Sequence, residues 1–216
     1  MQDDVVASAK KVFRDSEIAH RESLAKEDAS PVEDYDQVEK ARAIRNEIAR
    51  QARFDVKNFP GLRTAEDFAK GIILSKSKVK EGFLVWSGNV IPKSLIDLPK
   101  ESNKVAIQIF KDLLGYMGDK QMPFPAMLAQ DILRKGFEYK VLRDEIYMQI
   151  IKQITFNPRT ESQAKGWQML CMCLITFPPS VDFENFLLHF LLEKFEKGRG
   201  AVQDYARLFF FILFFF

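Results

Sequence analysis

The segment SNKVAIQIFKDLLGYMG, residues 102–118, has the period of an α-helix. Its apolar side chains recur every three and four residues, which places them along one helix face. Ser102 is a residue type that caps helix N-termini, and Gly118 can adopt the left-handed conformation at which helices often stop. We expect a helix with this buried stripe: Val105, Ala106, Ile109, Phe110, Leu113, Leu114 and Met117.

The same helical period continues along the rest of the chain, and no stretch shows sustained period-two alternation. The residues from Gly82 to Pro92 are expected to form an ordered loop. Residues 164–177, AKGWQMLCMCLITF, are apolar on nearly every side, so their helix is expected to run through the centre. The predicted fold is all-α, a compact multi-helix bundle. Its other helices are expected from Thr64, from Pro123 or Pro125 to Gly136, over 142–154, from Thr160 or Ser162, and from Ser180 to Gly198.

The charge distribution divides the chain near residue 54. Residues 1–53 contain 10 basic and 12 acidic residues, which leaves 22 basic and 18 acidic among the rest of the 32 and 30 in the chain. The apolar stripes in the first part are narrow and rich in alanine. We therefore expect 1–56 to be a charged helical or partly disordered N-terminal arm or linker. The net charge of +2 argues against a dedicated nucleic-acid binder.

The sequence contains no catalytic motif. Walker, G-x-G-x-x-G, G-x-S-x-G and H-E-x-x-H patterns are all absent. The 2 histidines, His20 and His189, and the 2 cysteines, Cys171 and Cys173, are too few for a four-ligand zinc site without carboxylates. We expect no enzyme activity and no catalytic, cofactor-binding or metal-binding residue. The expected location, cytoplasmic and cytoskeletal, follows from the scarce cysteines and from the resemblance described next.

Five segments carry a recognisable pattern: IPKSL (91–95), KVAIQIFKDLLGYMGDK (104–120), LAQDILRKGFEYKVLRDEIYMQIIKQITFNP (128–158), GWQMLCMCLITFPPS (166–180) and FENFLLHFLLE (183–193). Together they resemble the myosin tail homology 4 domain, over about 57–208. Such domains are helical bundles in the tails of unconventional myosins and some kinesins, usually before a FERM domain. The resemblance implies a non-catalytic interaction module that binds cargo or microtubules with a FERM domain, which these 216 residues lack.

Two groups of residues are singled out within the predicted domain. The first is structural: the helix-locking motif is expected to include Arg143, Asp144, Glu145 and Tyr147, with Trp167 in the core. Arg143 and Asp144 are interpreted as a structural ion pair. The second group comprises basic residues expected at the surface, where they can contact an acidic partner such as a tubulin tail: Lys104, Lys111, Lys120, Arg134, Lys135, Lys140 and Lys152.

The final octet, FFFILFFF at 209–216, departs from the family pattern. As a helix it spans only about 12 Å, against about 30 Å for the core of a bilayer. We interpret it as a gene-model artefact, and the alternative is a genuine hydrophobic tail. An alternative function also stays open: a stand-alone membrane-peripheral adaptor with a basic lipid-facing surface.

Overall fold

The computed structural model describes residues 40, 43, 47, 50–73 and 76–206, so the predicted arm lies mostly, and the octet entirely, outside the described residues. Within these ranges the fold is all-α, as predicted, with one isolated bridge between Leu62 and Ile96. The elements are η1 (Ala52–Phe54), η2 (Val56–Asn58), α3 (Ala65–Phe68), α4 (Lys76–Glu81), α5 (Lys100–Met117), α6 (Pro125–Glu138), η3 (Lys140–Leu142), α7 (Arg143–Ile154), α8 (Thr160–Thr176) and α9 (Val181–Lys197).

Local capping residues explain several helix ends. Gly118 ends α5 in the left-handed conformation, with φ at 77°. Ser180 precedes α9, and its hydroxyl accepts a hydrogen bond from the Phe183 amide at 3.2 Å. Both ends were predicted and are confirmed.

Two predicted helix ends are wrong. Helix α5 begins at Lys100 after Pro99 rather than at Ser102. Helix α6 continues past Gly136 to Glu138. Gly136 is needed for packing instead of termination: a Cβ atom there would lie 2.2 Å from the Phe177 ring. The glycine therefore lets Phe177 lie directly against α6.

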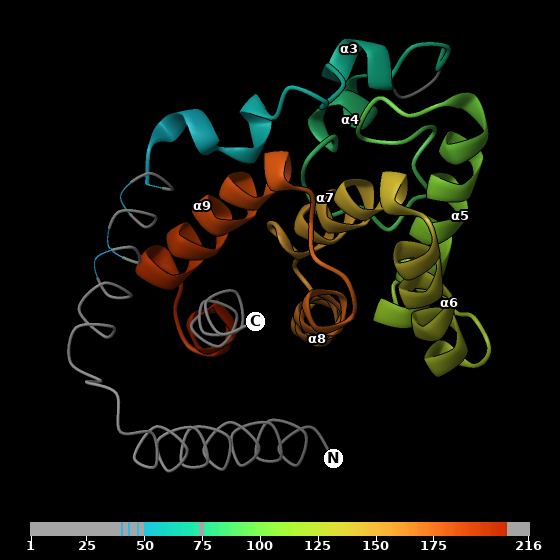
Figure 1. Cartoon of the computed structure of the whole chain (residues 1–216). Coiled ribbons are helices and arrows are strands. Elements are labelled where there is room, and N and C mark those ends of the chain that lie inside the picture. The colour runs from blue at the N-terminus through green and yellow to red at the C-terminus, as the bar shows by residue number, and fades with distance from the viewer. Residues whose placement is uncertain (1–39, 41–42, 44–46, 48–49, 74–75, 207–216) are drawn as a thin grey trace. The chain divides into compact units, whose positions relative to one another are not determined.

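The central helix is α7, so the prediction for 164–177 was wrong. Every residue from 145 to 154 is buried in α7. By contrast, the last turns of α8 reach the surface, where Ile175 is 69% exposed. Figure 1 shows α7 between α9 and α5, with α8 alongside. The reason is that polar side chains of α7 bind backbone groups of other segments, which apolar periodicity cannot reveal.

Aromatic side chains fill the core around α8 and α9. Trp167, 1% exposed, stacks against Phe190 at 6.1 Å between ring centroids and against Tyr205 at 6.0 Å, which confirms it as a core residue. The ring of Phe54 in η1 lies 5.4 Å from that of Phe186. The aromatic contacts of the bundle therefore start three residues before 57, the predicted start of the domain.

Candidate interaction surface

The charged triplet at the start of α7 joins three other segments. Arg143 donates to the carbonyls of Gly136, at 3.0 Å, and Phe137, at 3.4 Å. These are terminal carbonyls of α6 that lack helical partners. Asp144 accepts from the backbone amide of Ser180 at 2.8 Å and from its hydroxyl at 2.6 Å. Arg143 and Asp144 thus bind different elements. Among the described residues these two side chains form no ion pair with each other, so that prediction is wrong.

Glu145 holds the loop before α5 against α7. Its carboxylate accepts from the amides of Leu95 at 2.9 Å and Ile96 at 2.8 Å, and from the side chain of Gln149 at 2.7 Å. Burial raises the pKa of Glu145 to about 7, while the three N–H donors act in the opposite direction. Because this carboxylate is buried and fully hydrogen-bonded, it holds the loop in position and cannot contact a partner protein.

Tyr147, one turn further along α7, is also buried. Its hydroxyl donates to the carbonyl of Phe177 at 2.7 Å. Burial raises the pKa of this phenol far above its ordinary value. The hydroxyl is therefore a fixed hydrogen-bond donor between α7 and the α8–α9 connection.

Lys152 lies in the core, so its predicted surface position is wrong. The residue is 1% exposed. Its ammonium group donates to the carbonyl of Gly82 at 2.7 Å and to that of Val85. Burial lowers the pKa of Lys152 to about 7. This side chain fastens the 82–92 loop to α7 and is unavailable to an acidic partner.

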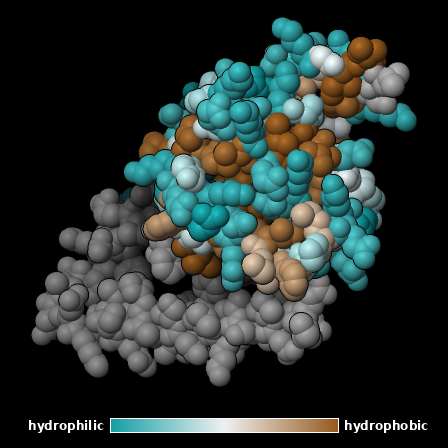
Figure 2. Space-filling model, turned by 90° about the vertical axis from the view of Figure 1, so that its right-hand side faces the viewer, coloured by the Kyte–Doolittle hydropathy of each residue, from teal (hydrophilic) through white to brown (hydrophobic). Residues whose placement is uncertain are grey.

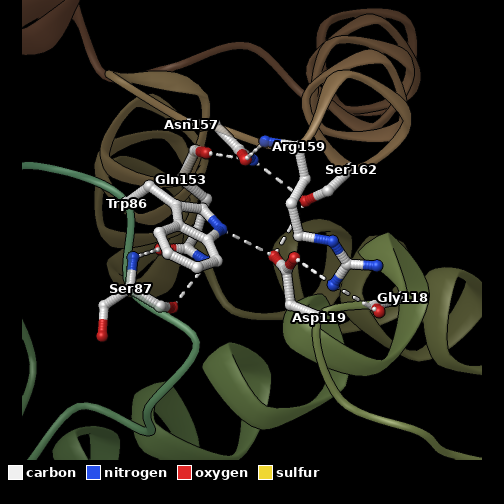
Figure 3. Close-up of polar contacts among 8 residues, drawn as sticks. All are labelled: Trp86, Ser87, Gly118, Asp119, Gln153, Asn157, Arg159 and Ser162. Carbon is white, nitrogen blue, oxygen red and sulfur yellow. Dashed lines mark hydrogen bonds and ion pairs between the residues drawn. The ribbon is translucent and has the colours of Figure 1, made fainter.

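A second buried carboxylate, Asp119, joins three loops at one end of the bundle (Figure 3). One oxygen accepts from the Trp86 indole at 3.0 Å and from the Ser162 hydroxyl at 2.9 Å. The other lies 3.1 Å from the guanidinium of Arg159, which also donates to the Gly118 carbonyl at 2.9 Å. The loops after Gly82, after α5 and after α7 are therefore fixed relative to one another.

The 82–92 loop is held from the α7 side as well. The side-chain oxygen of Gln153 accepts from the Ser87 amide at 3.1 Å, and its nitrogen donates to the Ser87 carbonyl at 3.1 Å. Neither Gln153 nor Asp119 was predicted to matter. For Asp119 the only sequence signal was its position directly after the helix-ending Gly118. For Gln153 there was none.

The predicted basic residues lie in different environments. Lys135 is only 15% exposed in its side chain and pairs with buried Asp112 at 3.1 Å, so its predicted surface position is also wrong. Lys104 is exposed and lies 3.4 Å from Glu101. Arg134 is exposed and lies 2.9 Å from Asp131 and 3.4 Å from Glu138. The other three are half-buried or exposed and form no ion pair within 4.0 Å among the described residues: Lys111, Lys120 and Lys140.

The side of the molecule in Figure 2 is not uniformly hydrophilic. Figure 2 shows hydrophobic side chains gathered between hydrophilic ones on the side of the molecule that it presents. The acidic partners of Lys104 and Arg134 further reduce the local positive potential. Exposed pairs of this kind contribute little to stability. Of the seven predicted basic residues, only Lys111, Lys120 and Lys140 therefore keep a solvent-accessible charge without an acidic partner among the described residues.

The described residues offer no centre for metal or thiol chemistry. They include no group of three His, Cys, Asp or Glu side chains placed to hold a metal ion. Cys171 and Cys173 are free, and burial raises the pKa of both thiols. None of the helices in this part of the chain has the length and apolar character needed to cross a bilayer.

Comparison with known proteins points to one family. Over 141 residues the chain is 46% identical to the high molecular weight form of myosin-1 of Acanthamoeba castellanii, which covers 65% of this chain and 9% of that protein. It is 30% identical over 131 residues to the kinesin-like protein KIN-14E of Arabidopsis thaliana, covering 54% of this chain and 10% of that protein. The chain thus spans about a tenth of the length of these two relatives.

A solved structure has the same fold. The human myosin 7b C-terminal MyTH4-FERM domain, solved in complex with the harmonin-a PDZ3 domain, superposes with a TM-score of 0.53 at 28% identity. The match covers 70% of this chain and 32% of that one. Residues 129–212 match the family model described as the MyTH4 domain. With the helical bundle and the myosin relatives, this match shows that the chain carries a MyTH4 domain, the myosin tail homology 4 domain that its sequence resembles.

Proposed function

We propose that this chain is a non-catalytic protein-interaction module of a cytoskeletal motor tail or motor-like scaffold. It binds cargo or microtubules, normally together with a FERM domain, in the cytoplasm and on the cytoskeleton. The observation that carries the proposal is the MyTH4 match, together with relatives among both myosins and kinesin-like proteins. The myosin 7b structure, solved with a bound PDZ domain, supports a role in protein binding.

Five of the predicted basic residues remain candidates for partner contact. Lys104 and Arg134 are exposed but paired with acids, whereas Lys111, Lys120 and Lys140 keep their charge available. An acidic partner gains more from uncompensated cations, because no existing ion pair has to be broken. We therefore assign the main electrostatic contribution to these three lysines.

Co-sedimentation with microtubules at low and high salt tests this assignment. Replacing Lys111, Lys120 and Lys140 together by Glu is expected to reduce binding, most strongly at low salt where screening is weakest. Lys197→Glu is the control for charge reversal elsewhere on the surface, because Lys197 lies on α9, is 74% exposed in its side chain and is already paired with Glu193. Equal binding by the triple variant and the parent would remove these lysines from the proposal. Binding to anionic liposomes but not to microtubules would favour the membrane-peripheral adaptor instead.

A further inference from the structure

Two phenylalanines combine an unfavourable backbone conformation with an exposed ring. Phe124 has φ at 52° and is 72% exposed, and Phe156 has φ at 51° and is 85% exposed. The left-handed region is disfavoured for bulky side chains. Neither ring is packed in the core, so the fold itself gains little from phenylalanine at these positions. Strained residues with exposed side chains are found preferentially at functional sites.

The turn around Phe156 is fixed by its neighbours. The Thr155 hydroxyl donates to the Ile151 carbonyl at 2.7 Å at the end of α7. The Asn157 side chain donates to the Gln153 carbonyl at 3.0 Å and accepts from the Arg159 amide at 2.9 Å. Pro158 restricts the chain further. The backbone at Phe156 is therefore held by residues on both sides, which directs the ring into solvent.

The two phenylalanines belong to loops that lie at the same end of the bundle. Phe124 is in the α5–α6 connection and Phe156 is in the α7–α8 connection. The Asp119 carboxylate joins these connections through Arg159 and Ser162. The same end of α6 presents Met127, which is 63% exposed. Two exposed rings thus lie on loops that are joined by Asp119, and Met127 lies in the first turn of the adjoining helix α6.

Cations surround these loops. Lys120 is exposed, whereas Arg159, 49% exposed in its side chain, is already paired with Asp119 at 3.1 Å. Lys165 lies close to the start of the α5–α6 connection: its Nζ is 3.7 Å from the point that a Cβ atom would occupy if Gly118 had one. Two acidic residues lie near these cations. Glu161, in the first turn of α8, is exposed, whereas the side chain of Asp119 is 0% exposed. The surface around the two rings therefore favours a partner with negative charge.

We propose that Phe124 and Phe156 are the aromatic anchors of a docking surface for an acidic segment of a partner protein that carries apolar side chains between its carboxylates. The apolar side chains bind the two rings, and the carboxylates bind Lys120 and Lys165, which form no ion pair among the described residues. Aromatic residues in interfaces supply most of the binding energy from few positions. This inference rests on the proposed function, because it names the chemistry of the protein partner.

Substitution by asparagine separates binding from folding. Asparagine tolerates the left-handed conformation, so Phe156→Asn and Phe124→Asn relieve backbone strain while removing the rings. We expect both variants to melt at the same or a higher temperature than the parent. Phe137→Asn is the control, because Phe137 is also exposed, at 64%, but lies within α6.

The probe is a short fluorescent peptide of glutamates with interspersed leucines, measured by anisotropy. Two matched peptides replace leucine by serine or glutamate by lysine. We expect the parent to bind the glutamate–leucine peptide more tightly than either matched peptide. Each loop variant should bind it about tenfold more weakly, because the variant can no longer bury one phenylalanine ring against the leucines. The control variant should bind like the parent.

Unchanged affinity in Phe156→Asn and Phe124→Asn, or equal affinity of the parent for the leucine and serine peptides, would overturn the inference. If the parent binds the leucine peptide but not microtubules, the docking surface stands. Only the proposal that microtubules are the partner is then refuted. Loss of binding in the triple lysine variant with no effect in the phenylalanine variants would support the proposed function and refute the aromatic anchors.

Discussion

Replacing Glu145 tests whether one buried carboxylate holds the loop before α5 in place. Its oxygens accept from the amides of Leu95 and Ile96, which are 0% and 6% exposed, and from Gln149. Glu145→Ala leaves these donors buried without their acceptor, and water cannot reach them easily. Glu145→Gln keeps one acceptor oxygen but turns an NH2 group toward N–H donors.

The cost follows from the number of donors left unsatisfied. A buried donor without a partner costs about 1–3 kcal/mol. With two backbone amides affected, Glu145→Ala is expected to lower the free energy of unfolding by about 4 kcal/mol. Glu145→Gln is expected to lower it by about 2 kcal/mol, since one amide keeps an acceptor. Either loss is a large fraction of the about 5–15 kcal/mol that stabilises a typical domain.

The pKa of Glu145 adds a dependence on pH. Because burial raises this pKa from 4.5 to about 7, the folded protein keeps a proton that the unfolded chain has lost within this interval. The resulting stabilisation is complete below pH 4.5 and is lost as the pH rises toward 7. Glu145→Gln has no ionisable group there, so its stability should not show this contribution.

Urea unfolding of the full chain, followed by circular dichroism and tryptophan fluorescence at several pH values, measures both effects. Glu161→Gln is the control, because Glu161 is exposed in the first turn of α8. It should change stability by less than about 0.5 kcal/mol. If Glu145→Ala is as stable as the control, the carboxylate does not hold the loop. If the pH dependence is identical in Glu145→Gln and the parent, the pKa of Glu145 is not raised in the folded protein.

Three further changes test the core. Trp167→Ala should lower the free energy of unfolding by about 3–5 kcal/mol, as deletion of a buried aromatic ring does, and an unchanged melting temperature would show that the ring is not in the core. Gly136→Ala should cost about 1–3 kcal/mol in chemical denaturation because its Cβ meets the Phe177 ring, and wild-type stability would show that the ring moves aside freely. The depressed pKa of Lys152, about 7 instead of 10.5, predicts that stability rises with pH between these values, since the unfolded chain then binds the extra proton. Lys152→Met should abolish that rise, and an equal rise in both proteins would contradict a buried amine.

The sequence by itself determined where most helices lie and what ends two of them, α5 at its C-terminus and α9 at its N-terminus. Helix period, the serine before α9 and the glycine after α5 act through contacts within a few residues, so their effect can be seen in a short window. The burial of Trp167 was also predicted correctly, because its helix is apolar around that residue. The family motifs could also be recognised from the sequence, because each is a run of neighbouring residues.

Only the tertiary structure decided which helix is central and which charged residues are inside. Glu145 binds Leu95 across 50 residues of sequence, Asp144 binds Ser180 across 36, and Lys152 binds Gly82 across 70. A glutamate or lysine in a short window predicts exposure, because an isolated buried charge is unfavourable. Here distant backbone groups satisfy these side chains, and their positions exist only once the chain has folded.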